Sequence, residues 1–352
     1  MPAPTDAYGN LIWNETGLQS YWRFGELSGT SAADAKGTNT GTYQGTPTLG
    51  GAGIPADLGI NSSVALNGTS QYISAATIDL TDGPLTLECW VKLTAINFYQ
   101  SLICKVGTGT YYLQINNSNF PELAAVGVQD MAISSTALTD TSSWHHIVGT
   151  KTGTTPKIYL DGVDRTSGPI NSVLVNTADG LSIGSRGGTT DWLHGSIDEV
   201  AIYNVVLDAA TVATHFAIGI GQTARPTSDV LIGGWTTDQG LMTNEYSRIN
   251  EVTANDTNYV QSSLVPAADP ITFALGTLIT PLRGQQTLKY RYAKDQSGVP
   301  VNLQVDLLQN GIVVQTWTHT DIPLAWTEAD QIVTGITDFN LPLSITFTAT
   351  QP

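Results

Sequence analysis

The residue types best suited to chemistry in this sequence are those that recognise sugars. A glycine-rich loop carries an arginine, an aspartate and a tryptophan close together, and a tyrosine and a glutamine alternate along an expected strand, so they share one face of it. Aromatic rings stack on sugar rings, and planar polar groups form paired hydrogen bonds with hydroxyl groups. The pattern predicts a carbohydrate site at one edge of a β-sandwich, unless the tryptophan simply closes that edge. The candidate residues are Tyr112, Gln114, Arg186, Asp191 and Trp192.

Other residue pairs offer less chemistry. His145 and His146 suggest a metal site, but successive residues of a strand point to opposite faces, so we do not expect them to share an ion. For the same reason Asp198 and Glu199 are expected to face opposite ways. No serine, histidine and aspartate set occurs in a context typical of nucleophilic catalysis. These observations favour a protein that is not an enzyme.

The composition indicates an all-β protein. Only 12% of the 352 residues are charged, about half of the usual share of roughly 25%. Thr, Ser, Asn and Gly suit strands and turns better than exposed helices. The chain has 14 Lys and Arg against 30 Asp and Glu, a net charge of −16. Without a basic stripe, we expect no nucleic-acid partner, and without an apolar run of about 18 residues we expect no membrane insertion.

The N-terminal segment and the cysteines bear on where the chain is made. Residues 1–17 lack the basic and long apolar regions of a secretory signal, so we expect synthesis in a cytoplasm. The same residues are expected to form an extended arm that contacts either its own sandwich, as an edge strand, or a neighbouring subunit. Cys89 and Cys104 are too few for a disulfide framework. They are expected to be two buried thiols, or else neighbours on one hairpin.

Short alternating segments and turn signals predict many strands. Residues 86–92 place Leu87, Cys89 and Val91 on one face of a strand. Asp-Gly at 161–162 and Asn-Gly at 310–311 predict two-residue hairpin turns. A single helix is expected over residues 208–216, with Asp208 as its N-cap.

The chain is expected to contain two β-domains. A break in composition, with two glycines and a proline, predicts a linker over residues 219–227. Residues 18–218 then form a larger sandwich and residues 228–352 a smaller one.

Six segments in order make the first domain similar to the laminin-G-like, concanavalin A-like family. The resemblance extends over residues 21–216 and implies a jelly-roll sandwich in a family that includes lectins and glucanases. The glucanase signature, Glu-x-Asp-x-(x)-Glu on one strand, does not occur here, since the central strand offers Glu88 alone. The segments are 21–34, 65–73, 85–92, 144–150, 158–162 and 195–203.

The same resemblance implies a structural calcium ion that ties the opening segment to the closing strand. Asp198 matches the acid of the closing strand, and Glu26 or Asp34 would supply the opening side. Calcium takes six to eight oxygen ligands, many of them carbonyls, so two acids suffice. The alternative is that these acids cap turns, as the segment after Asp34 suggests.

The second half resembles β-domains appended to tailed-phage virion proteins. The segments are residues 225–235, 255–260 and 288–292. The resemblance implies a virion structural protein on the particle surface, as a capsid decoration or head fibre, or as a tail adhesion component. Its partners would be other virion proteins, further copies of itself and a glycan. The alternatives are a secreted carbohydrate-binding lectin and a polysaccharide-degrading glycoside hydrolase.

Overall fold

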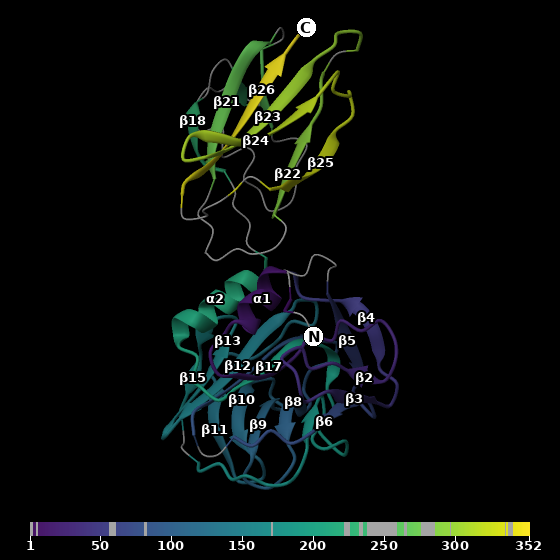
Figure 1. The fold of residues 1–352 in the computed structure, drawn as a ribbon, viewed down its shortest axis with the longest axis vertical. Coiled ribbons are helices and arrows are strands. Elements are labelled where there is room, and N and C mark those ends of the chain that lie inside the picture. The colour runs from purple at the N-terminus through teal and green to yellow at the C-terminus, as the bar shows by residue number, and fades with distance from the viewer. Residues whose placement is uncertain are drawn as a thin grey trace. The chain divides into compact units, whose positions relative to one another are not determined.

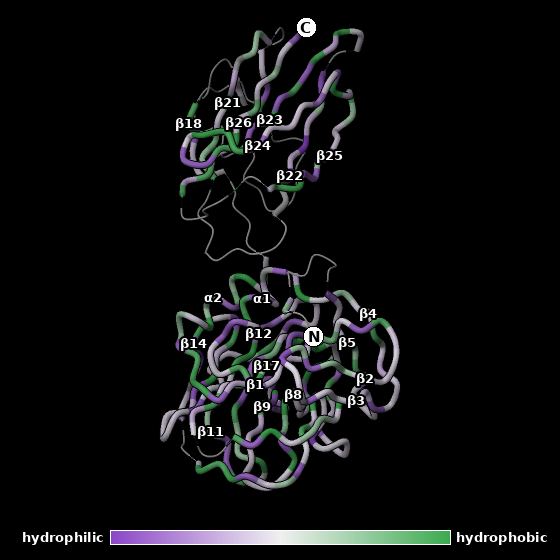
Figure 2. The backbone as a smooth tube through the Cα atoms, in the orientation of Figure 1, coloured by the Kyte–Doolittle hydropathy of each residue, from purple (hydrophilic) through white to green (hydrophobic). Residues whose placement is uncertain are grey.

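The computed structural model divides the chain into two units, Met1–Gly221 and Gln222–Pro352 (Figure 1). The structure describes residues 3–4, 6–55, 61–80, 83–169, 172–221, 226–231, 235–237, 259–263, 266–275, 286–295, 297–334, 336 and 341–352. Both units are built almost wholly from antiparallel strands, which confirms the predicted all-β class. Hydrophobic and hydrophilic residues are interspersed along these strands (Figure 2).

The N-terminal unit is a sandwich of an eight-stranded and a nine-stranded sheet. The eight-stranded sheet has the order β14-β13-β12-β7-β17-β5-β4, and β1 also pairs with β17. Its strands are β1 (Leu18–Trp22), β4 (Thr48–Ala52), β5 (Ser62–Asn67), β7 (Leu85–Leu93), β12 (His145–Thr152), β13 (Thr155–Leu160), β14 (Val163–Asp164) and β17 (His194–Tyr203).

The nine-stranded sheet has the order β15-β11-β10-β9-β8-β16-β6-β3-β2. Its strands are β2 (Ser31–Ala32), β3 (Gly41–Gln44), β6 (Tyr72–Ala75), β8 (Gln100–Lys105), β9 (Tyr111–Ile115), β10 (Pro121–Ala125), β11 (Gln129–Ser134), β15 (Thr166–Ser167) and β16 (Leu181–Ile183).

The central strand β7 shows how alternation builds the sandwich. Leu87, Cys89 and Val91 enter the core between the two sheets, as the sequence pattern predicts. Glu88 and Trp90 point to the outer face, yet both are fully buried. Their burial requires a further layer on that face, which two helices supply.

The helices α1 (Ala7–Trp13) and α2 (Ala209–Gly219) pack against each other on the outer face of the eight-stranded sheet (Figure 1). Asp208 caps α2 by accepting a hydrogen bond from the Thr211 backbone N–H at 2.8 Å, so the predicted helix is confirmed. Phe216 of α2 stacks on Trp90, with ring centroids 5.8 Å apart.

The expected extended arm of residues 1–17 is wrong, because α1 occupies its middle. The Asp6 carboxylate accepts a hydrogen bond from the Gly9 backbone N–H at 2.7 Å and so caps the helix. Tyr8 and Ile12 lie four positions apart, share one face, and are fully buried. The apolar residues of this segment therefore cover their own unit as a helix rather than as an edge strand.

The C-terminal unit is a smaller sandwich. A five-stranded sheet has the order β18-β21-β26-β23-β24, and two further pairs are β19-β20 and β22-β25. Phe273 and Val305 from the larger sheet and Tyr290 from β22 share one core. The strands are β18 (Pro226–Leu231), β19 (Thr236–Thr237), β20 (Val260–Gln261), β21 (Ala267–Leu275), β22 (Gln286–Tyr292), β23 (Asn302–Gln309), β24 (Ile312–His319), β25 (Thr327–Val333) and β26 (Leu343–Thr350).

The two predicted hairpin turns are confirmed. Gln309 pairs with Ile312 across Asn310-Gly311, whose φ angles are 51° and 77°. Leu160 pairs with Val163 across residues 161–162, with φ angles of 52° and 75°. Positive φ at both central positions defines the type I′ turn, which these dipeptides tolerate.

The linker and phage-like segments, the two cysteines and the helices can be compared with the predictions from the sequence. Residues 222–225 of the expected linker, and residues 225, 232–234 and 255–258 within the phage-like segments, lie outside the described residues. Cys89 and Cys104 are buried free thiols. Neither described helix has the length and apolar character needed to cross a bilayer.

Candidate functional site

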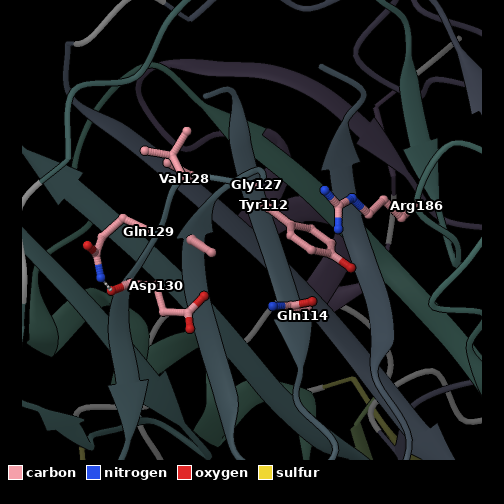
Figure 3. Close-up of a pocket in the computed structure, with 9 residues that line it drawn as sticks. Tyr112, Gln114, Gly127, Val128, Gln129, Asp130 and Arg186 are labelled. Atoms are coloured by element: carbon pink, nitrogen blue, oxygen red, sulfur yellow. Dashed lines mark hydrogen bonds between the residues drawn. The ribbon is translucent and has the colours of Figure 1, made fainter. Parts of the chain in front are cut away.

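A polar pocket lies on the outer face of the nine-stranded sheet. Leu113 and Ile115 of β9 enter the core, so Tyr112 and Gln114 point the opposite way, into the pocket. The pocket has a volume of about 300 Å³, and Figure 3 shows its lining side chains. The lining residues are Tyr112, Gln114, Ala124, Ala125, Gly127, Val128, Gln129, Asp130 and Arg186.

One side of the pocket is held by Tyr112, Arg186 and Asp191. The Tyr112 hydroxyl donates a hydrogen bond to Asp191 Oδ2 at 3.0 Å. The Arg186 guanidinium lies over the Tyr112 ring, 5.8 Å from its centroid, and its Nη1 is 3.8 Å from Asp191 Oδ2. The sequence-predicted loop and strand therefore do meet. The Tyr112 ring, however, is covered by the guanidinium and offers no open stacking platform.

The loop that carries Arg186 depends on its glycines. Gly187 and Gly188 have φ angles of 66° and 69°, a backbone conformation that other residues rarely adopt. A Cβ on Gly188 would lie 2.6 Å from Tyr72 Cζ. In this loop Arg186 and Thr190 form a backbone bridge, and Arg186 lines the pocket.

The other side of the pocket contains a carboxylate pair that sequence reasoning missed. The Gln114 side-chain amide donates to Glu122 Oε1, and Asn116 Nδ2 donates to Glu122 Oε2 at 3.0 Å. Burial, together with the charge of Asp130, raises the pKa of Glu122 to about 7. Glu122 is buried beside the pocket, whereas Asp130 is exposed and lines it.

Trp192 stands apart from this arrangement. Its ring packs edge-to-face on Tyr72, with centroids 5.9 Å apart, and it does not line the pocket. Of the predicted carbohydrate residues, Tyr112, Gln114 and Arg186 line one cavity and Asp191 supports it. Trp192 has the position expected of a residue that closes the sandwich edge.

The three predicted calcium ligands do not gather. Asp34 Oδ1 accepts from the Tyr21 and Lys36 backbone N–H groups at 2.9 and 3.0 Å, so Asp34 closes a turn. Glu26 accepts from the Ala33 backbone N–H at 2.7 Å, within its own loop. Among the residues that the structure describes, no group of three or more histidines, cysteines and acids forms a metal site. Glu26 and Asp34 thus close a loop and a turn, as the alternative interpretation of the sequence holds, and a site that joins one of them to Asp198 through backbone carbonyls stays a prediction.

A β-bulge overturns the expectation that Asp198 and Glu199 face opposite ways. The register of β17 against β7 shifts between Asp198 and Ala201, and Glu199 has a φ of 51°. As a result, Asn61 Nδ2 lies 3.5 Å from Asp198 Oδ1 and 2.9 Å from Glu199 Oε1. The same nitrogen is 2.9 Å from the Arg23 carbonyl oxygen. Three oxygens thus converge on one atom.

This convergence keeps calcium as a prediction centred on Asp198. Oxygen ligands from an acid, a second acid and a carbonyl suit calcium, and a turned Asn61 amide would add a fourth. If calcium binds there, chelation should lower the melting temperature, since a ligand at one hundred times its Kd stabilises by about 2.7 kcal/mol. Asp198→Asn should abolish this response, and Asp34→Asn should keep it. Identical melting curves with and without chelator would contradict the prediction.

A second polar cluster lies under the helices and centres on Glu88. Glu88 Oε1 accepts hydrogen bonds from the Tyr8 hydroxyl at 3.0 Å, His146 Nε2 at 2.8 Å and His215 Nδ1 at 2.9 Å. The Tyr203 hydroxyl donates to Oε2 at 2.8 Å. The cluster joins α1, α2, β7, β12 and β17.

The ionisation of this cluster follows from its partners. Burial alone would raise the pKa of Glu88, but the His215 charge and the hydrogen bond from His146 outweigh it and lower that pKa. Burial opposes protonation of His215, yet the Glu88 charge and the hydrogen bond to Glu15 raise its pKa to about 9. His215 Nε2 lies 3.3 Å from Glu15 Oε1, so both ring nitrogens face carboxylates. Because Glu88 and both histidines at its centre are fully buried, the cluster fastens the helices to the sheet.

His145 lies on the other side of β12 from His146, as expected. Its Nδ1 is 2.9 Å from Asp161 Oδ2 at the end of the neighbouring strand. The two histidines therefore point to opposite faces and make different contacts.

The match to a known family lies within the N-terminal unit. Residues 67–213 match the family model of the concanavalin A-like lectin/glucanases superfamily, in its laminin-G form. No curated protein matches the chain.

Three of the similar solved structures are distant in sequence. A Trypanosoma rangeli sialidase bound to 2,3-difluorosialic acid is 15% identical with a TM-score of 0.44, over 58% of this chain and 33% of the sialidase chain. Domain 4 of the extracellular arabinanase AbnA from Geobacillus stearothermophilus, bound to arabinotriose, is 18% identical with a TM-score of 0.44, over 56% and 97% of the chains. The binding domain of Paraclostridial Mosquitocidal Protein 1 is 11% identical with a TM-score of 0.45, over 75% and 78%.

The family match and the strand topology agree for the first unit. Residues 67–213 include the pocket-bearing strands β9 to β11, the central strand β7 and the closing strand β17. This part of the chain is thus similar to the concanavalin A-like lectin/glucanases superfamily, and its antiparallel sheets form a sandwich.

Proposed function

We propose that this chain is a non-enzymatic structural protein of a bacteriophage virion whose N-terminal unit binds a glycan. The observation that carries the glycan half is the polar pocket formed by Tyr112, Gln114, Asp130 and Arg186 on an outer sheet face. Helices α1 and α2 cover the outer face of the other sheet, so the pocket lies on the face they leave open. Amide, guanidinium and carboxylate groups are suited to the hydroxyl groups of sugars.

The positions of the acids support a binding role rather than catalysis. Glu88 is fully buried beneath two helices, and Asp198 and Glu199 are fully buried at the bulge of β17. Both oxygens of Glu122 accept hydrogen bonds from amides. Each of these carboxylates thus has a structural partner.

One observation favours glycoside hydrolysis as the second candidate. The pKa of Glu122 is raised to about 7 beside the exposed Asp130. Two carboxylates with different pKa values can act as the general acid and the general base of glycoside hydrolysis. Release of reducing sugar from a bound polysaccharide, lost in Glu122→Gln, would support this candidate over a purely binding role.

The glycan prediction is tested by the pocket residues themselves. Arg186→Ala and Gln114→Ala should each weaken glycan binding by about tenfold, since a good hydrogen-bonding group is worth roughly 1–2 kcal/mol. The measurement is titration calorimetry with a glycan selected on an array. Trp192→Ala, outside the pocket, is the matched control and should bind within about threefold of the wild type. If Arg186→Ala and Gln114→Ala bind the glycan as tightly as Trp192→Ala and the wild type do, the glycan site lies elsewhere.

The virion half of the proposal rests on sequence resemblance. The phage-like segments fall at residues 225–235, 255–260 and 288–292, and the strongly acidic composition suits a protein displayed at high local concentration. We assign the contacts with other virion proteins, and with further copies of this chain, to the C-terminal unit. Tyr8 and Ile12 of α1 are buried against their own unit, so these apolar side chains are not available for docking to another protein.

Mass spectrometry of purified particles tests the virion assignment. The chain should be present in each particle, in hundreds of copies for a capsid decoration or in a few for a tail component. Its absence from particles, with the protein found free in the medium, would favour the secreted lectin instead.

A further inference from the structure

We infer that the pocket accepts neutral sugars and rejects sugars that carry a carboxylate. This inference deepens the proposed function and rests on it. It starts from the charges that line the cavity rather than from its shape.

The positive charge of the pocket is already matched. Arg186 is the one cation among the lining residues, and its Nη1 lies 3.8 Å from Asp191 Oδ2. Its guanidinium also covers the Tyr112 ring. An anionic sugar would have to compete with Asp191 for this cation.

The negative charge of the pocket is not matched in the same way. Asp130 is exposed and lines the wall opposite Arg186 (Figure 3). The buried Glu122 is close enough for the charge of Asp130 to raise its pKa. No lysine lines the cavity. With Asp130, Asp191 and one arginine, the pocket carries a net negative charge even when Glu122 is protonated. A second carboxylate brought by the ligand would meet like charge at short range.

The polar groups that remain suit hydroxyl groups. A carboxylate such as Asp130 accepts hydrogen bonds from two adjacent hydroxyls. Gln114 donates its amide N–H to Glu122, and in Figure 3 its oxygen points toward the Tyr112 and Arg186 side of the cavity. The wall thus presents acceptors for sugar O–H groups, while the arginine N–H groups remain as donors.

The test uses pairs of sugars that differ in charge but little in shape. Oligosaccharides of glucose and glucuronic acid, of galactose and galacturonic acid, and of mannose and mannuronic acid are titrated into the full chain by calorimetry. In at least one pair the neutral member should bind about tenfold or more tightly than the acid, since like charges a few ångströms apart cost more than 1 kcal/mol near a protein surface. The preference should shrink at about 1 M salt, where the screening length is about 3 Å.

Two variants of equal charge locate the effect. Asp130→Asn keeps a polar amide but removes the charge, so it should cut the neutral-over-acid preference to about threefold or less. Asp179→Asn removes an exposed acid that does not line the pocket, and should leave the preference unchanged. Uronic acids that bind as tightly as their neutral partners in every pair that binds, or an unchanged preference in Asp130→Asn, overturn this inference alone. Failure of every sugar to bind overturns the proposed function as well.

Discussion

Replacing Glu88 with alanine is expected to lower the free energy of unfolding of the N-terminal unit by about 3–5 kcal/mol. The substitution removes the acceptor for two histidines and two tyrosines, all of them fully buried. It also leaves the charge of His215 under a helix with only Glu15 beside it. Hydrogen-exchange mass spectrometry measures this loss, because it follows peptides of each unit separately.

The matched control is Asp179→Asn, which removes one negative charge from an exposed position of the same unit. It should change the free energy by less than about 0.5 kcal/mol. Glu88→Gln keeps the shape and should fall between the two. A cost below about 1 kcal/mol for Glu88→Ala would mean that the helices do not depend on this carboxylate.

The pH dependence gives the same experiment a second readout. Because the pKa of His215 is raised from 6.5 to about 9, its contribution to stability is fully present below pH 6.5 and is lost as the pH rises through 9. The pKa of Glu88 is lowered, so Glu88 acts on the acidic side of the pH range. Its contribution to the stability of the unit is present above pH 4.5 and is lost as the pH falls below that value. Glu88→Ala should flatten the decline on the alkaline side.

Deleting residues 1–17 is expected to destabilise the N-terminal unit by about 3–6 kcal/mol, since full burial of a large side chain contributes roughly 1.5–3 kcal/mol. The deletion removes Tyr8 and Ile12, both fully buried, and exposes Trp90 and Glu88 beneath them. The measurement is protection of β7 and α2 peptides against hydrogen exchange, together with binding of a hydrophobic dye.

Two point variants show whether the buried face of α1 is responsible. Ile12→Ala should cost about 2–5 kcal/mol, whereas Leu11→Ala, at a half-buried position of the same helix, should cost clearly less. An N-terminal unit that keeps full protection without residues 1–17 would restore the hypothesis of a free docking arm.

The strands and turns were accessible from the sequence because their causes are local. The alternation of Leu87, Cys89 and Val91 reflects a two-residue period, and Asn310-Gly311 meets a requirement for positive φ. The helix after Asp208 has a capping aspartate and needs no distant contact to be recognised. These elements were predicted with nearly correct bounds.

The candidate site was only partly predictable, because its contacts cross long stretches of chain. Tyr112 and Asp191 are 79 positions apart, so residue types suggest that their strand and loop form one site, but only the folded chain shows that the two side chains meet. The helix α1 is seven residues long and contains a glycine and an asparagine, so its stability comes from burial of Tyr8 and Ile12 rather than from helix propensity. The bulge at Glu199 likewise depends on neighbouring strands, and a strict alternation rule cannot foresee it.

The contact between α1 and α2 has a consequence for how this unit can be inserted into other proteins. The first and last elements of the unit meet on one outer face, while the pocket opens on the outer face of the opposite sheet. A unit whose entry and exit lie side by side can be spliced into a loop of a host protein without stretching the host at that point. The pocket would then face away from the insertion point, so the same unit could bind its ligand when inserted into unrelated proteins.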